Sequence, residues 1–222
     1  MPTKQRSNRK NEIERRAADL IAEHGYDRTS LRDLADSMQI SKGTVLHHFG
    51  TKDRLLERLH ATYMRKRLAE AELITAAFKT PPARLAGFVY QLMIVQESDR
   101  AATVAFAREI VRFATDDLMD DVRRMRTRYS AMLTDVIEDG IRTGDFKPAD
   151  AQVIALMIFG MCNWSWTWFD PNGRLTSTQI AETFTTTLIH GLANDGTANY
   201  DPQETARIVN EAINAVAATQ LP

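Results

Sequence analysis

The chain has one cysteine, Cys162, so it cannot form an internal disulfide bond, and its fold does not depend on an oxidising compartment. It also lacks any run of about 18 uninterrupted apolar residues that could span a bilayer. Residues 151–169 come nearest, but polar side chains interrupt them. The N-terminus has no apolar signal-peptide core. We therefore expect a cytoplasmic protein that has no membrane partner.

Catalytic signatures are missing as well. There is no nucleophile elbow, phosphate loop, dinucleotide fingerprint or HExxH helix, so we expect no cofactor and no enzyme. An all-α enzyme with a DNA-binding head is the less favoured alternative. His47 and His48 are adjacent, but neighbouring residues on a helix point about 100° apart and no third ligand accompanies them. A metal site is therefore not predicted.

Strand patterns are absent too. Apolar and polar residues do not clearly alternate, and no Asn-Gly hairpin signal occurs. Instead, apolar residues recur at helical spacing along nearly the whole chain, and a hydrophobic content of 44% over 222 residues suffices for a buried core. We predict an all-α fold, in which the most apolar helix covers residues 151–169.

Neither sign of charge is in large excess, because the formal net charge is -1. The distribution is uneven. Residues 1–60 hold 12 Lys and Arg against 9 Asp and Glu, whereas the remainder holds 16 against 20. Most of the positive excess lies within the first 16 residues. Such a basic arm suits DNA phosphates or a minor groove, although an ordinary solvated tail would have the same composition.

The most informative segment is residues 29–52, TSLRDLADSMQISKGTVLHHFGTK. Ser30 and Asp33 form a capping-box pattern ahead of apolar residues at helical spacing, which predicts a short helix. Ser41 is then the expected N-cap of a second short helix, whose predicted buried side chains are Val45, Leu46 and Phe49. Two such helices joined by a tight turn place the start of the second one in a DNA major groove.

The segment from Ile13 to Leu56 resembles the tetracycline-repressor (TetR) family of bacterial one-component regulators. The resemblance is carried by Ile13, Ala17, Leu20, Gly25-Tyr26, Ser30 to Ala35, Ile40 to Thr44, His48-Phe49, Lys52 and Leu55-Leu56. Two positions differ from the family pattern. Gln39 replaces a usual glycine and must adopt a left-handed conformation, and Leu46 replaces a usual tyrosine that touches the DNA backbone.

The resemblance implies a helix-turn-helix DNA-binding domain with a basic arm over residues 1–55. An effector-binding and dimerisation domain would cover residues 56–222. The predicted DNA contacts are Ser30, Lys42, Gly43, Thr44, His47, His48 and Lys52. Lys42 and Thr44 would reach base edges, whereas Ser30 and Lys52 lie at helix N-termini that favour a phosphate. Any one of these residues could instead cap a helix or face solvent.

The family assembles through its C-terminal helices, so the resemblance implies a homodimer on a near-palindromic DNA operator. The helices around residues 151–192 would then form the dimer contact, unless they are buried within one chain. Trp164 and Trp168 are four residues apart and share one helix face, which suits either an effector pocket or the dimer contact.

The remaining predicted effector-binding residues are Phe106, Arg108, Arg112 and Phe113, with the arginines facing an anionic ligand group. The turn over residues 168–175 resembles that of TetR members which sense acyl-CoA thioesters or govern lipid breakdown. We therefore predict a transcriptional repressor released by a largely apolar small-molecule effector of the acyl-CoA or lipid-metabolite type. The alternatives are a DNA-binding dimer without a small-molecule input and a multidrug-sensing regulator of efflux.

Overall fold

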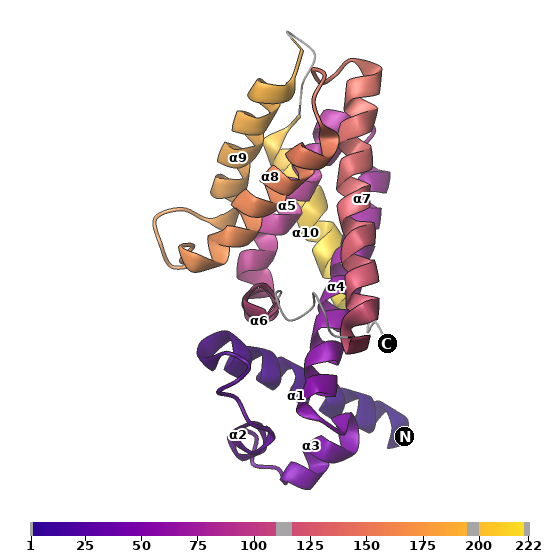
Figure 1. Ribbon diagram of the computed structural model, residues 1–222. Helices are drawn as coiled ribbons and strands as arrows, with labels where there is room; N and C mark the ends of the chain where they lie inside the picture. Colours follow the sequence, from indigo (N-terminus) through magenta and orange to yellow (C-terminus); the bar gives the residue numbers. More distant parts are fainter. Residues whose placement is uncertain (1, 110–116, 195–199, 220–222) are drawn as a thin grey trace. The chain divides into compact units, whose positions relative to one another are not determined.

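The computed structural model describes residues 2–109, 117–194 and 200–219, with side chains from Arg9 onward. Over these residues the chain is helical and has no strand (Figure 1). It forms two compact units. The head unit comprises Met1–Met64 and Asp99–Arg124, and the body unit comprises Arg65–Ser98 and Met125–Pro222. The predicted all-α fold is confirmed.

The head unit contains α1 (Pro2–His24), α2 (Leu31–Ser37), α3 (Lys42–Phe49), the first half of α4 (Lys52–Ala77) and α6 (Arg100–Glu109). The predicted basic arm is therefore the helical start of α1. Apolar side chains at helical spacing form the core of this unit, namely Ile13, Ala17, Leu20, Leu34, Ala35, Val45, Phe49 and Leu55. These contacts fix the positions of α2 and α3 relative to each other and to α1.

The turn between α2 and α3 depends on a left-handed residue. Gln39 has φ of +55°, as predicted, and is the one non-glycine residue with positive φ in the described part of the chain. The backbone then turns back sharply, because the N–H of Ile40 donates to the carbonyl oxygen of Ala35 at 3.0 Å. This turn directs the N-terminus of α3 away from the core.

The body unit contains the second half of α4 and the helices α5 (Pro81–Ser98), α8 (Ala151–Asn163), α9 (Ser177–Leu192) and α10 (Pro202–Ala218). It also includes most of α7 (Asp120–Thr143), which follows the 3-10 turn η2 (Asp117–Met119). Helix α5 is buried along nearly its whole length and packs against α8, α9 and α10. Helix α4 approaches α5 closely at Gly87, where a Cβ atom would lie 2.5 Å from Cγ2 of Ile74.

The most apolar helix is shorter than the sequence predicted. Helix α8 ends at Asn163, and residues Trp164–Thr167 form the 3-10 turn η3 rather than continuing to Phe169. The hydroxyl of Ser165 donates to the carbonyl oxygen of Cys162 at 2.5 Å, and the side-chain amide of Gln96 donates to it at 3.3 Å. These two bonds satisfy a carbonyl in the last turn of α8, where backbone carbonyls have no α-helical partner.

The two compact units do not coincide with the predicted division at residue 55. That position lies inside α4, whose first half belongs to the head unit and whose second half belongs to the body unit. The predicted division assigned DNA binding to one range of residues and effector binding to another. The compact units report contacts and not these functions, so the division stays a prediction. Helix α6 is far along the chain from the helix-turn-helix, but it belongs to the same compact unit.

Candidate DNA interface, assembly face and effector region

The N-terminus of α2 has the predicted capping box. The hydroxyl of Ser30 accepts from the N–H of Asp33 at 3.1 Å, and the N–H of Ser30 donates to Oδ2 of Asp33 at 2.8 Å. Hydrogen bonding to Ser30, first to its side chain and then to its backbone, lowers the pKa of the Asp33 carboxyl below its ordinary value. Both side chains are exposed, so Ser30 combines a structural role in α2 with a position open to a phosphate.

The N-terminus of α3 is held in a similar way. The hydroxyl of Ser41 accepts from the N–H of Thr44 at 3.0 Å, and the two hydroxyl oxygens lie 3.0 Å apart. Lys42, Gly43 and His47 are exposed, whereas Thr44 and His48 are half-buried. The predicted N-cap at Ser41 is therefore confirmed, and the first turn of α3 carries exposed residues on a capped backbone.

One predicted core position of α3 is wrong. Val45 and Phe49 are buried as expected, but Leu46 is 39% exposed. In a helix of eight residues, positions 45 and 49 share one face, and position 46 is rotated by about 100° from residue 45. Leu46 consequently lies on the outward side of the helix with Lys42 and Gly43 and adds an apolar group to the candidate DNA surface.

Lys52 is the first residue of α4, which Thr51 caps by accepting the N–H of Arg54 at 3.1 Å. Its ammonium lies over the ring of Tyr26, with Nζ 3.9 Å from the ring centre. Lys52 is half-buried, so it is more restricted than an ordinary surface lysine. Its place at a helix N-terminus suits contact with a DNA phosphate.

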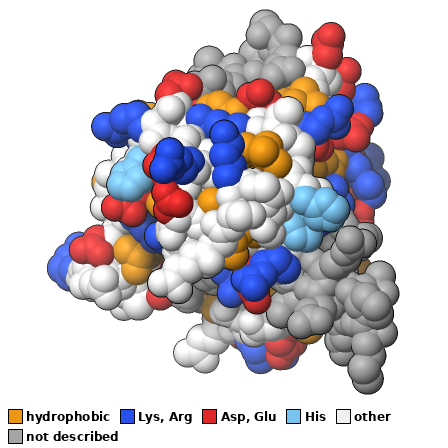
Figure 2. All heavy atoms as spheres, turned by 90° about the horizontal axis from the view of Figure 1, so that it is seen from below, with side chains coloured by type: hydrophobic (Ala, Val, Ile, Leu, Met, Phe, Trp, Pro, Cys, Tyr) orange, Lys and Arg blue, Asp and Glu red, His pale blue; other side chains and the backbone are white. Residues whose placement is uncertain are grey.

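Figure 2 shows the side chains on the face of the molecule that is seen from below. Lys, Arg and His side chains are spread over this surface, and acidic and apolar side chains lie between them. The mixed charge agrees with the small basic excess of the first 60 residues.

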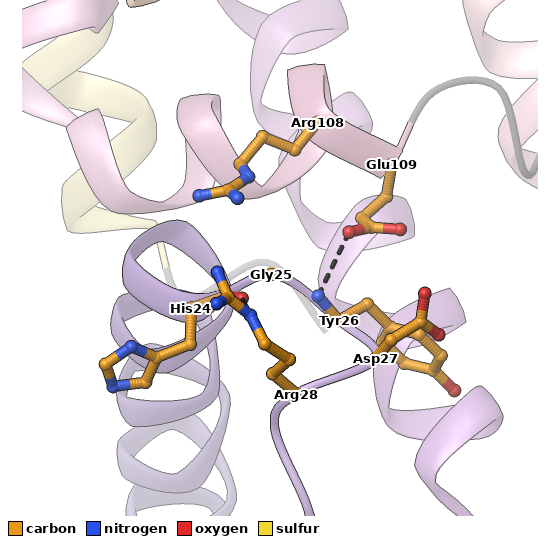
Figure 3. Close-up of a pocket in the computed structure, with 7 residues that line it drawn as sticks. All are labelled: His24, Gly25, Tyr26, Asp27, Arg28, Arg108 and Glu109. Carbon is orange, nitrogen blue, oxygen red and sulfur yellow. Dashed lines mark hydrogen bonds between the residues drawn. The ribbon is translucent and has the colours of Figure 1, made fainter.

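Two of the predicted effector-binding residues lie on α6, in the head unit. The ring of Phe106 stacks on that of Tyr63, with a centroid distance of 4.7 Å. The guanidinium of Arg108 lies against the C-terminal end of α1 (Figure 3), where Nη1 donates to the carbonyl oxygen of Ala22 at 2.8 Å. Arg112 and Phe113 fall outside the described residues.

An open groove of about 560 Å³ lies between the end of α1 and the end of α6, within the head unit. Its walls are mostly polar and consist of His24, Gly25, Tyr26, Asp27, Arg28, Arg108 and Glu109 (Figure 3). Glu109 accepts the backbone N–H of Tyr26 at 3.0 Å, and Nε of Arg28 donates to the carbonyl oxygen of His24 at 2.8 Å. The groove therefore consists largely of groups that already bind one another.

The two predicted effector-binding tryptophans lie at the surface of the body unit. Trp164 is 65% exposed and Trp168 is 51% exposed, and Trp168 contacts Phe184 of α9 edge to face. Three apolar side chains of α8 are also strongly exposed, namely Val153, Leu156 and Met157. Together these five residues are named the assembly face below. A solvent-facing apolar patch of this kind is typical of a protein contact.

The sequence did not reveal a buried polar network in the body unit. Nη2 of Arg67 donates to Glu70 at 2.7 Å, and the amide of Gln91 donates to Glu70 and to the carbonyl oxygen of Arg67, both at 2.9 Å. The hydroxyl of Tyr129 donates to Gln91 at 2.7 Å. Only the Arg67–Glu70 spacing could have indicated it, because Gln91 and Tyr129 come from α5 and α7.

Two family models match this chain. The model described as bacterial regulatory proteins, tetR family, matches residues 13–59. The model described as tetracyclin repressor-like, C-terminal domain, matches residues 79–192, which is more than half of the chain. The chain belongs to the TetR family. This confirms the predicted family and, with the helix-turn-helix of α2 and α3, the prediction of a DNA-binding transcriptional regulator.

Similar proteins within the TetR family extend over most of the chain. The HTH-type transcriptional repressor KstR2 of Mycobacterium tuberculosis is 26% identical over 191 residues, which cover 86% of this chain and 96% of KstR2. The structure of that ketosteroid transcriptional regulator has a TM-score of 0.79 and covers 84% of this chain and 96% of its own. The structure of AibR in complex with isovaleryl coenzyme A and operator DNA has a TM-score of 0.73 at 24% identity, covers 82% of this chain and 98% of its own, and shows the shared fold.

In the described ranges of this TetR-family chain, no helix is both long enough and apolar enough to cross a bilayer. The apolar helix α8 has only 13 residues, whereas a bilayer-spanning helix needs about 20.

Proposed function

We propose that this TetR-family protein is a transcriptional repressor that binds a near-palindromic operator as a homodimer. It leaves the operator when its body binds a largely apolar small molecule of the acyl-CoA or lipid-metabolite type. The observation that carries the DNA-binding part is the exposed start of α3. Its Ser41 cap is already satisfied within the helix, so Lys42 and Gly43 face outward on a fixed backbone.

The proposed contacts divide into base readers and phosphate contacts. Lys42 has a long side chain near the helix start and is suited to the acceptor atoms of guanine. Thr44 is held near Ser41, so it would read a base at short range. His47 and His48 lie one turn further along, and Ser30 and Lys52 contact phosphates at the starts of α2 and α4. Gly43 lets the backbone of α3 approach the groove closely.

The assembly face is the proposed dimer contact. Its five large apolar side chains would remain in water in a single chain, and a two-fold axis lets the same surface of a second copy cover them. The predicted alternative, a helix pair buried within one chain, does not account for this exposure. Trp164 and Trp168 are therefore assigned to the dimer contact rather than to the effector pocket.

The effector part of the proposal is supported by the relatives. KstR2 is named a ketosteroid regulator, and AibR was solved with isovaleryl coenzyme A and operator DNA.

Fluorescence anisotropy with the DNA upstream of the protein's own gene tests the proposal. We expect operator binding with Kd of about 10⁻⁸ M or tighter at physiological salt. Lys42→Ala should weaken binding, and Thr44→Ala should relax preference at one base pair. The matched control is Lys79→Ala, which changes an exposed lysine of the α4–α5 connection. If Lys42→Ala and Thr44→Ala both bind like Lys79→Ala, the proposed base contacts are wrong.

The same assay tests the effector class. Isovaleryl coenzyme A and a long-chain acyl-CoA should release the labelled operator, whereas free coenzyme A should not, because it lacks the apolar acyl group. Release by unrelated hydrophobic drugs alone would favour a multidrug sensor. Retention of the operator with every compound would favour a dimer that has no small-molecule input.

A further inference from the structure

Tyr26 lies in the turn between α1 and α2 and is bound at three points within the head unit. Its backbone N–H donates to Oε1 of Glu109 on α6 at 3.0 Å (Figure 3). Its hydroxyl donates to Oδ1 of Asp53 in the first turn of α4 at 2.5 Å. One face of its ring lies under the ammonium of Lys52, with Nζ 3.9 Å from the ring centre. Tyr26 is thus held at its backbone and at its hydroxyl, and its ring carries a cation on one face.

The contact between Lys52 and the ring is short for its kind. Cation–π attraction operates within about 6 Å of a ring centre, and a partly buried pair is stronger than an exposed one. Tyr26 is buried and Lys52 is half-buried, so water screens this pair only in part. The attraction restricts a side chain that would otherwise lose much rotational freedom on binding a phosphate.

This attraction leaves the hydrogen-bonding capacity of Lys52 available for DNA. The ring interacts with the positive charge, whereas a phosphate would accept from the N–H groups of the ammonium, which has three donors. The first turn of α4 adds backbone N–H groups and the helix dipole on the same side. Lys52 is therefore held where an incoming phosphate meets both the ammonium and the helix end.

We propose that Tyr26 is a positioning residue for DNA binding: its ring holds the Lys52 ammonium ready for a phosphate. Asp53 binds the hydroxyl of the ring, and Glu109 binds the backbone N–H of Tyr26. This inference rests on the proposed phosphate contact of Lys52. It adds that the strength of this contact depends on Tyr26, which does not itself touch DNA. It also gives α6 a part in DNA binding, through a residue 83 positions from Tyr26 in the chain.

A double-mutant cycle on operator affinity tests the inference. Lys52→Ala should weaken binding and lower the salt slope of log K by about one. Tyr26→Leu keeps an apolar side chain but removes the ring, and it should weaken binding about fivefold. In the Lys52→Ala background, Tyr26→Leu should have almost no further effect, because the lysine that the ring positions is gone. Tyr26→Phe keeps the ring and should recover most of the affinity.

The outcomes separate this inference from the proposed function. If Lys52→Ala weakens binding but Tyr26→Leu weakens it equally in both backgrounds, Tyr26 only supports the fold, and the inference fails while the phosphate contact stands. If Lys52→Ala changes neither the affinity nor the salt slope, the proposed phosphate contact fails, and the positioning role fails with it.

A second measurement tests the inference even if the Tyr26→Leu variant is unstable. In the intact protein, the ring current of Tyr26 should shift the Lys52 side-chain protons upfield in the NMR spectrum. Tyr26→Phe should keep that shift, and its melting temperature should stay close to that of the unaltered protein. Absence of the shift in the unaltered protein would overturn the inference regardless of any binding result.

Discussion

The guanidinium of Arg108 donates to the carbonyl oxygen of Ala22 at 2.8 Å, across 86 positions of the chain. Ala22 lies in the last turn of α1, where backbone carbonyls have no partner within the helix. A cation is favoured at this end because the helix dipole is negative there. This contact, together with the bond from Tyr26 to Glu109, attaches α6 to the end of α1.

We expect Arg108→Ala to lower the free energy of unfolding of the protein by about 1–2 kcal/mol, because a part-buried carbonyl loses a charged donor. Thermal melting followed by circular dichroism measures this. Arg28→Ala is the matched control, since Arg28 also donates to an α1 carbonyl but at an exposed position where water can replace it. Equal losses in the two variants would contradict the prediction.

Replacing Gly43 should change the stability of the protein and its affinity for the operator in opposite directions. A Cβ atom at this position would meet only Oγ of Ser41 at 3.5 Å, which is an ordinary contact. Gly43→Ala should therefore stabilise the protein by up to about 1 kcal/mol through helix propensity. The added methyl group should weaken operator binding, since it enlarges the surface proposed to approach the base edges. If Gly43→Ala has a higher melting temperature and binds the operator with unchanged affinity in anisotropy titrations, Gly43 is not part of the DNA interface.

The assembly face gives a prediction about oligomeric state. Leu156→Glu places a charge at the most exposed apolar side chain of α8 and should convert the dimer to a monomer at micromolar concentration. Light scattering should then report a mass near the 25.1 kDa of one chain. Leu73→Glu, at an exposed leucine of α4, is the matched control and should leave the dimer intact. A monomeric unaltered protein would refute the dimer itself.

His60 makes stability depend on pH. It is buried in α4 beside the ring of Phe106, and burial lowers its pKa from 6.5 to about 3. The unfolded chain takes up a proton near pH 6.5, but the folded chain does not until about pH 3. The stability that depends on neutral His60 is therefore present above pH 6.5 and is lost as the pH falls towards 3, with a slope of at most about 1.4 kcal/mol per pH unit.

His60→Leu should remove this pH dependence, so the free energy of unfolding of the unaltered protein should fall relative to that of the variant as the pH is lowered from 7.5 to 5. Urea titrations at several pH values measure the difference. A constant difference over that range would show that His60 does not titrate on unfolding as proposed.

Local features of the fold could be read from the sequence, because they depend on neighbours along the chain. The helical spacing of apolar residues, the Ser30–Asp33 capping box and the Ser41 cap follow from contacts within a few residues. The left-handed Gln39 was predicted from the resemblance to the TetR family, in which a glycine usually holds this position. The family was identified from this same segment, since the helix-turn-helix is compact in sequence as well as in space.

Only the tertiary structure decided the features that join distant residues. It placed the guanidinium of Arg108 against the carbonyl oxygen of Ala22 in α1, and it exposed Leu46 on the outward side of α3. It ended α8 at Asn163, where Gln96 and Ser165 both donate to the Cys162 carbonyl oxygen. The Tyr26–Glu109 bond belongs to the same class: its partners are 83 positions apart, and no local propensity or periodicity specifies which surfaces of two helices will meet.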